Sequence, residues 1–227
     1  PKLLVIAELD EHGKKKKDTK PIYEATIRNH DEIFKLLENI SIKCNLKQAK
    51  EIVLSGDGAP WIWNKFKEFQ LKLNISHKTT EILDFYHATE HLTQISEANT
   101  SLDPKERKEW FNNLKNLLKT GQLKELEDNI IKESKKKKLV SLLDLWQYFE
   151  KNKARMKYDE YRENNQPVGS GLVESAIRRV INLKLKSPSS FWKIDNLERM
   201  LQLRCIFMSG RWDIFKQNLL KESQIAV

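Results

Sequence analysis

Residues 51–60 read EIVLSGDGAP, an apolar run that stops at an aspartate flanked by glycines and is followed by a proline. The run at 51–54 has the length and β-branched content of a short buried strand. Pro60 suits the first turn of a helix, which continues into the aromatic sequence WIWNKF. The stretch therefore predicts a strand, a tight turn at Asp57 and a helix, in the alternating order of an α/β fold.

The segments on either side of this stretch extend the alternation. Upstream, the apolar runs at 3–7 and 22–27 predict two strands of a hairpin, joined by a turn that contains four consecutive lysines. Asp31 can cap a helix that reaches about residue 39. Downstream, residues 81–83 predict another strand, and a helix is expected from about residue 88. Strands and helices in this order indicate an α/β sheet.

Strand signals stop after Asn99. Pro104 opens a helical pattern that Gly121 ends, and further helical segments follow at 123–134 and 139–149. We therefore expect an all-helical insertion inside an α/β core. The chain then divides into three segments: a first part of the core at 1–88, the insertion at 89–165, and the rest of the core at 166–227.

The last segment begins as a loop rich in glycine and continues as three helices. The first of these helices is expected over about 173–185, and the other two near 196–208 and 212–220. The spacing of the apolar residues in the first helix predicts one apolar stripe. This stripe consists of Val173, Ile177, Val180, Ile181 and Leu185.

The composition indicates a folded, basic protein. The 227 residues are 39% hydrophobic and 32% charged, which excludes a disordered chain. The net charge of +9 favours a polyanionic partner, because neutralising phosphates releases counterions. A soluble protein that is merely basic is the alternative.

Cysteines and hydropathy point to the cytoplasm. Cys44 and Cys205 lie far apart, without the spacing of a zinc site, and are expected to be reduced thiols. No apolar run approaches the roughly 20 residues that span a membrane, and no signal peptide is visible. The chain starts at Pro1 within a predicted strand, so we expect a fragment whose N-terminal part lies upstream.

Three polar clusters stand where apolar runs end. The glycines around Asp57 leave space beside its carboxylate for a ligand, and oxygen ligands suit Mg²⁺; an ordinary Asp-Gly turn is the alternative. Glu174 begins a helix after a Gly-Ser-Gly loop. A structural explanation is also complete, because the helix dipole favours a glutamate in the first turn and Ser170 could cap the helix. The combination of Asp57 with Glu174 favours a metal site.

The third cluster is the sequence DFYH, which carries Asp84 and His87. His91 follows four residues later, and two histidines at this spacing on a helix can bind zinc. No third ligand has a suitable spacing, so zinc is not expected. We expect Asp84 and His87 to support the site or contact substrate, and a histidine hydrogen-bonded within the core is the alternative.

Basic and aromatic residues follow Glu174. They could hold phosphates, or they could be solvated charges on a helix surface. Trp192 lies in the polar segment 187–192 and could stack on a base or pack beneath a loop. The candidate DNA-binding residues are Arg178, Arg179, Lys184, Lys186 and Trp192, with Lys193 adding a further positive charge.

The order of these motifs resembles that of bacterial insertion-sequence transposases of the DDE type. The matching stretches are GDGAPWIWN at 56–64, LDFYHA with EHL at 83–92, and PVGSGLVESA at 167–176. The basic run 178–186 and the tail motifs LQLR and SGRWD, within 201–213, follow in the same order. The resemblance covers most of residues 1 to 220.

The resemblance implies an α/β fold with an RNase H-like core and an all-helical insertion before the last catalytic helix. It implies three carboxylates holding two divalent ions, Mg²⁺ or Mn²⁺. Asp57 matches the second aspartate and Glu174 the glutamate, while Asp84 and His87 match an Asp-x-x-His element between them. The first aspartate is expected on a strand upstream of the chain, with Asp10 as a substitute candidate.

The implied activity is phosphoryl transfer at DNA ends, namely end cleavage and strand transfer. The implied partners are transposon ends and target DNA, bound by a homodimer or a larger assembly in the cytoplasm, at the nucleoid. Two alternatives remain open. One is an RNase H-like nuclease such as a resolvase, and the other is a DNA-binding remnant without catalysis, which a chain lacking the first aspartate would be.

Overall fold

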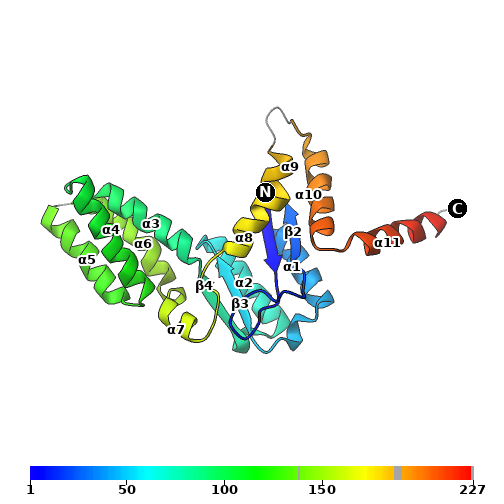
Figure 1. The fold of residues 1–227 in the computed structure, drawn as a ribbon, viewed down its shortest axis with the longest axis horizontal. Helices are drawn as coiled ribbons and strands as arrows, with labels where there is room; N and C mark the ends of the chain where they lie inside the picture. The colour runs from blue at the N-terminus through cyan, green and yellow to red at the C-terminus, as the bar shows by residue number, and fades with distance from the viewer. Residues whose placement is uncertain (138, 187–190, 226–227) are drawn as a thin grey trace. The chain divides into compact units, whose positions relative to one another are not determined.

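The structure is a computed structural model, which describes residues 1–137, 139–186 and 191–225 (Figure 1). The protein is α/β, with helices predominating over two small sheets. It forms two compact units. The terminal unit comprises residues 1–49 and 171–227, and the middle unit comprises residues 50–170. The segments 1–88, 89–165 and 166–227 remain a prediction about domain organisation.

The terminal unit begins with the predicted hairpin. β1 (Lys2–Ile6) and β2 (Ile22–Thr26) pair antiparallel. α1 (His30–Lys43) follows and leads to a short 3₁₀ turn, η1 (Leu46–Gln48). The predicted cap at Asp31 is wrong, because the side chain of Asn29 accepts the Glu32 N–H and Asp31 lies in the first turn. An acidic residue there interacts favourably with the helix dipole.

The helix predicted over 173–185 contains a π-helical segment. α8 (Gly171–Ala176) continues into η4 (Ile177–Asn182), which is π-helical, and then into α9 (Leu183–Leu185). A π-helix bonds i to i+5, so the face that a residue occupies shifts along the segment. Ile177, a member of the predicted apolar stripe, is 37% exposed, whereas Ala176 beside it is buried.

Arg204 bonds the backbone of the π-helical segment. It lies on α10 (Ile194–Met208), which α11 (Trp212–Ile225) follows. Its guanidinium Nε donates to the carbonyl of Val180 at 2.8 Å, and Nη2 donates to the carbonyl of Arg179. Burial lowers the pKa of Arg204. These charge-assisted bonds stabilise a backbone geometry that departs from the α-helix.

The core of the terminal unit lies between the hairpin and two helical segments. In Figure 1, α10 runs beside β2, and α8 lies next to β1. The hairpin contributes Tyr23 and Ala25 to this core, and α10 contributes Leu201 and Cys205. The helix from α8 to α9 completes it with Ala176, Val180, Ile181 and Leu185.

Side chains bond the backbone along the outer edge of β2. Tyr23 donates its N–H to Ser209 Oγ at 2.9 Å, and its carbonyl accepts from Arg211 Nη2 at 3.0 Å. Buried Glu198 accepts the Ile27 N–H at 2.8 Å. The N–H and carbonyl of Tyr23 therefore point away from β1. Tyr23 and Val5, which lie opposite each other, form a non-hydrogen-bonded pair. The backbone groups of Val5 therefore face the opposite edge of β1, which pairs with no strand among the described residues.

The middle unit begins with the predicted strand-helix-strand. β3 (Ile52–Gly56) and β4 (Thr79–Leu83) pair in parallel, connected by α2 (Pro60–Leu73) and a 3₁₀ turn, η2 (Ser76–Lys78). The outer edge of β4 is bonded by a side chain, because Tyr158 Oη donates to the Leu83 carbonyl at 2.9 Å. The outer edge of β3 has no strand partner in the described part of the chain.

The rest of the middle unit is helical, as the apolar spacing predicts. α3 (Phe85–Ala98) begins three residues before the predicted start, because Asp84 caps it. α3, α4 (Pro104–Lys119), α5 (Leu123–Lys137) and α6 (Val140–Asn152) each pack against the next, and α6 packs against α3 (Figure 1). The 3₁₀ turn η3 (Lys153–Arg155) and α7 (Tyr158–Glu163) follow. Among the described helices, none has the length and apolar character needed to cross a membrane.

Candidate functional site

Two predicted site residues follow directly on the paired ends of β3 and β4. Gly56 lies opposite Leu83 in the parallel register, and Asp57 and Asp84 come next on the two strands. The Asp84 N–H donates to the carbonyl of Gly56 at 2.9 Å, which extends the pairing by one residue. Because neighbouring parallel strands lie about 5 Å apart, the structure brings both aspartates to one edge of the sheet.

The turn at Asp57 is fixed from two sides. Asp57 Oδ1 accepts the Ala59 N–H at 3.0 Å, while the Asp57 carbonyl accepts from Tyr148 Oη on α6 at 2.8 Å. Gly58 has a φ of +89°, and a Cβ there would lie 2.5 Å from Tyr148 Oη. Gly58 thus allows the tyrosine to approach the backbone, and the exposed Asp57 carboxylate is held on a braced turn.

Asp84 is buried, with 3% of its surface exposed. Its Oδ1 caps α3 by accepting the N–H groups of Tyr86 at 2.7 Å and His87 at 2.9 Å. Its Oδ2 is buried and has no hydrogen-bond partner among the described residues. Since buried polar atoms are nearly always satisfied, this oxygen is an acceptor available to a bound group.

Two histidines of α3 approach Tyr148. His87 Nδ1 lies 3.1 Å from Glu90 Oε2. The rings of His91 and Tyr148 stack, with centroids 3.6 Å apart and planes inclined by 22°. Burial, followed by the neighbouring His87, lowers the pKa of His91 and favours its neutral form.

The hydroxyl of Tyr148 is held protonated. Burial raises its pKa, and the negative charges of Asp57, Asp84 and Glu90 raise it further. A protonated hydroxyl is the donor that the bond to the Asp57 carbonyl requires. Sequence reasoning missed Tyr148 because it lies 91 residues after Asp57, next to an apolar residue of α6, with no local motif to single it out.

The aspartates have the ligand type that Mg²⁺ and Mn²⁺ prefer. Asp57 offers an exposed carboxylate, and Asp84 offers a buried oxygen without a partner. The rings of His87 and His91 lie 5.1 Å apart. Residues 1–137, 139–186 and 191–225 contain no group of three or more His, Cys, Asp or Glu residues that could hold a metal ion. These residues fit a divalent cation by their chemistry, and further ligands are needed to complete a site.

The remaining predicted ligands lie in the terminal unit. Glu174 is exposed in the first turn of α8, which belongs to the terminal unit. Asp57 belongs to the middle unit. Asp10 forms a turn, in which its Oδ1 accepts the N–H groups of His12 at 3.0 Å and Lys14 at 2.9 Å. The bond from Lys14 contributes most to lowering the pKa of Asp10.

The candidate DNA-binding residues have different environments. Arg178, Lys184 and Lys186 are exposed. Arg179 is half-buried, and its Nη2 donates to Tyr23 Oη at 3.0 Å. Trp192 packs against the core of the terminal unit, with a buried indole N–H that has no partner among the described residues. Residues 187–190, the rest of the polar segment predicted around it, lie outside the described residues.

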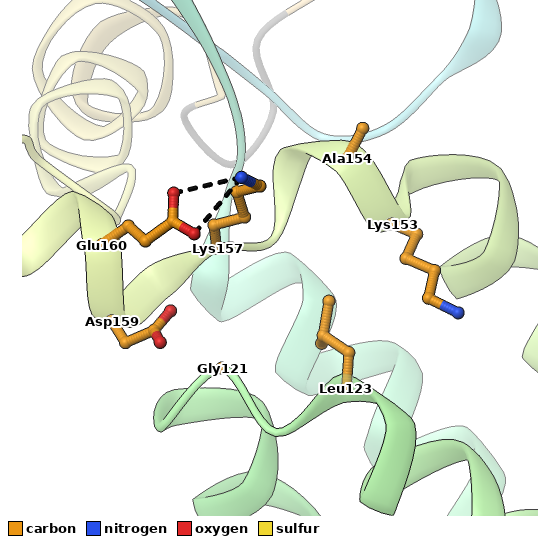
Figure 2. A pocket seen from close by; sticks show the side chains of 7 residues that line it. All are labelled: Gly121, Leu123, Lys153, Ala154, Lys157, Asp159 and Glu160. Atoms are coloured by element: carbon orange, nitrogen blue, oxygen red, sulfur yellow. Dashed lines mark hydrogen bonds and ion pairs between the residues drawn. The ribbon is translucent and has the colours of Figure 1, made fainter.

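A hollow of about 510 Å³ lies elsewhere in the middle unit (Figure 2). Its walls carry both charges, and Lys157 Nζ bonds both carboxylate oxygens of Glu160, at 3.2 and 3.1 Å. None of its lining residues is a predicted site residue. They are Gly121, Leu123, Lys153, Ala154, Lys157, Asp159 and Glu160.

Comparison with known proteins identifies a family. Neither the curated proteins nor the solved structures contain a match to this chain. Among protein-family models, the one described as "Uncharacterised protein family (UPF0236)" matches residues 1–217. This match covers the middle unit, most of the terminal unit and every predicted site residue. The chain therefore belongs to the uncharacterised protein family UPF0236.

Proposed function

We propose that this protein is the catalytic domain of a DDE-type DNA transposase, which cleaves and joins DNA ends by metal-dependent phosphoryl transfer. The observation that carries the proposal is the placement of Asp57 and Asp84 at the neighbouring carboxyl ends of two parallel strands. Their sequence motifs are two of those that resemble DDE transposases. The basic character of the chain, +9 overall, supports a DNA substrate.

The proposed metal ligands are Asp57 and Glu174, with Mg²⁺ or Mn²⁺, and two ions, as cofactor. Bound divalent ions supply Lewis acidity to the phosphate and stabilise the leaving oxygen. Asp57 contributes an exposed carboxylate on a turn that Tyr148 and Gly58 brace. Asp84 contributes an acceptor oxygen at the same edge of the sheet, and His87 lies in the first turn of the helix that Asp84 caps.

The finer fold that we propose is an RNase H-like core with a helical insertion before the last catalytic helix. An antiparallel pair precedes a parallel pair along the chain, and the helices α3 to α7 precede α8. Side chains bond one edge of each sheet, at β2 and at β4, whereas β1 and β3 have an edge with no strand partner in the described ranges. A further strand, on which the resemblance places the first aspartate, would find a partner at either open edge.

Binding of Mn²⁺ to the 227-residue chain tests the site. Titration calorimetry is expected to show binding that both Asp57→Asn and Glu174→Gln weaken at least tenfold. Asp144→Asn is the matched control, because Asp144 is an exposed acid on α6 away from the predicted motifs. Mn²⁺ binding that neither site variant alters would refute the shared metal site.

The reaction is tested with DNA. The proposal predicts that a protein which includes the strand bearing the first aspartate joins a cut end to target DNA when Mg²⁺ is added. Cleavage without joining would identify a nuclease such as a resolvase. DNA binding without either reaction would identify a binding remnant. Since joining produces a longer, branched product, gel electrophoresis separates these outcomes.

A further inference from the structure

The start of α10 exposes large apolar side chains beside basic ones. Phe191 is 97% exposed and Ile194 is 73% exposed. The neighbouring Trp192 packs against the core, so the two consecutive aromatic residues have opposite environments. Exposed apolar surface that is rimmed by polar residues marks a partner-binding site, and both Phe191 and Ile194 contribute apolar surface here.

Basic residues flank this exposed ring on both sides along the chain. Lys184, Lys186, Lys193 and Arg199 are exposed, and none of them forms an ion pair within the described residues. Asp195 is the acidic residue exposed on the same turn. Glu198, one turn further on, is buried and bonded to Thr26 and Ile27 of the hairpin. The exposed charge here is four positive against one negative, which favours a polyanion.

The lysines and the phenylalanine lie close along the chain. α9 ends at Leu185, and only five residue steps separate Lys186 from Phe191, so a fully extended chain would keep them within roughly 18 Å. Phosphates follow one another about every 3.4 Å along the axis on each strand of a DNA duplex. One DNA segment can therefore reach the ring and several of the charges together.

We propose that Phe191 with Lys184, Lys186, Lys193 and Arg199, the α10 tip, binds DNA by stacking the ring on an unpaired base. The basic residues contact flanking phosphates. Bases stack on exposed aromatic rings regardless of sequence, and apolar side chains inserted at base steps are a recurrent way of gripping distorted DNA. This inference rests on the proposed function for its choice of DNA, and it assigns the stacking to Phe191 instead of Trp192.

The test compares two DNA probes by fluorescence anisotropy. One is a fully paired 30-base-pair duplex, and the other carries four unpaired bases at its centre. The Phe191→Ala variant of the full chain is expected to bind the unpaired probe at least fivefold more weakly, with little change for the duplex. The paired variant Lys184→Gln/Lys186→Gln is expected to weaken binding to both probes. It should also reduce the slope of log K against log salt by about 0.9 for each phosphate that the variant no longer neutralises.

Phe207→Ala is the matched control, because Phe207 is 62% exposed near the other end of α10. Equal affinities of Phe191→Ala and Phe207→Ala for the unpaired probe would overturn the stacking role while DNA binding stands. A wild-type chain that binds neither probe would overturn the proposed DNA partner as well. Loss of binding to phosphatidylglycerol vesicles in Phe191→Ala, with DNA binding unchanged, would assign the tip to a membrane surface and overturn the inference.

Discussion

Replacing Gly58 with alanine tests the braced turn at Asp57 directly. The φ of +89° at Gly58 disfavours any residue with a Cβ, at about 1–2 kcal/mol. The new Cβ would lie 2.5 Å from Tyr148 Oη, 2.8 Å from Tyr148 Cε2 and 2.9 Å from Leu83 Cδ1. Forcing these atoms apart costs about 1–3 kcal/mol. The free energy of unfolding is therefore expected to fall by about 2–5 kcal/mol, a large part of the stability of an ordinary domain.

Urea unfolding followed by circular dichroism at 222 nm measures this loss. Gly171→Ala is the control, because no atom lies within 4 Å of a Cβ built at Gly171, which begins α8. The control is expected to leave stability unchanged or to raise it by up to about 1 kcal/mol. A loss below about 1 kcal/mol for Gly58→Ala, or equal effects of the two variants, would refute the reasoning.

A double-mutant cycle then identifies the clash. Tyr148→Phe removes the closest atom, Oη, together with its bond to the Asp57 carbonyl, and alone is expected to cost about 1 kcal/mol. Combined with Gly58→Ala, it should cost at least about 0.5 kcal/mol less than the sum of the single changes. Strict additivity would show that Tyr148 and Gly58 do not press on each other.

Three further predictions concern buried or half-buried groups. Glu198→Ala is expected to cost about 3 kcal/mol in urea unfolding, because it leaves the Ile27 N–H and the Thr26 hydroxyl of the hairpin without their acceptor. The pKa of His91 is lowered by burial, so its contribution to stability is complete above the unfolded pKa of about 6.5 and is lost as pH falls towards the folded pKa. His91→Phe should therefore lose less stability than wild type between pH 7.5 and pH 5, as urea unfolding at both values would show. Burial raises the pKa of Cys205 to about 12, so iodoacetamide at pH 8 should modify exposed Cys44 first. Mass spectrometry should detect alkylated Cys205 only after urea is added.

Local sequence signals predicted helices and strands well where a motif marks the boundary of the helix or strand. The proline at position 60 marks the start of α2, and the apolar runs gave the antiparallel hairpin and both parallel strands. Local signals also placed Asp57 and Asp84 at strand ends, which the parallel register then brings side by side. Such features depend on a few neighbouring residues, so they can be predicted from the local sequence.

Features that depend on distant contacts were missed. Tyr148 reaches the Asp57 turn from another helix, and Arg204 bonds π-helical carbonyls more than twenty residues before it. Trp192 faces the core while Phe191 faces water, a choice that packing makes between two similar residues. At α1 two nearby residues, Asn29 and Asp31, were both possible caps. Asn29 caps the helix because its side chain accepts the Glu32 N–H.

The π-helical segment between α8 and α9 has a genetic consequence. A turn closed by i to i+5 bonding holds one residue more than an α-helical turn, so η4 can lose a residue and become α-helical without rotating the flanking helices. Ala176 and Leu185 would keep their inward directions, whereas the same deletion within α10 would turn every later side chain by about 100°. Codon deletions should therefore be tolerated at 177–182 far better than in the neighbouring helices, and relatives of different length can differ here while sharing one core.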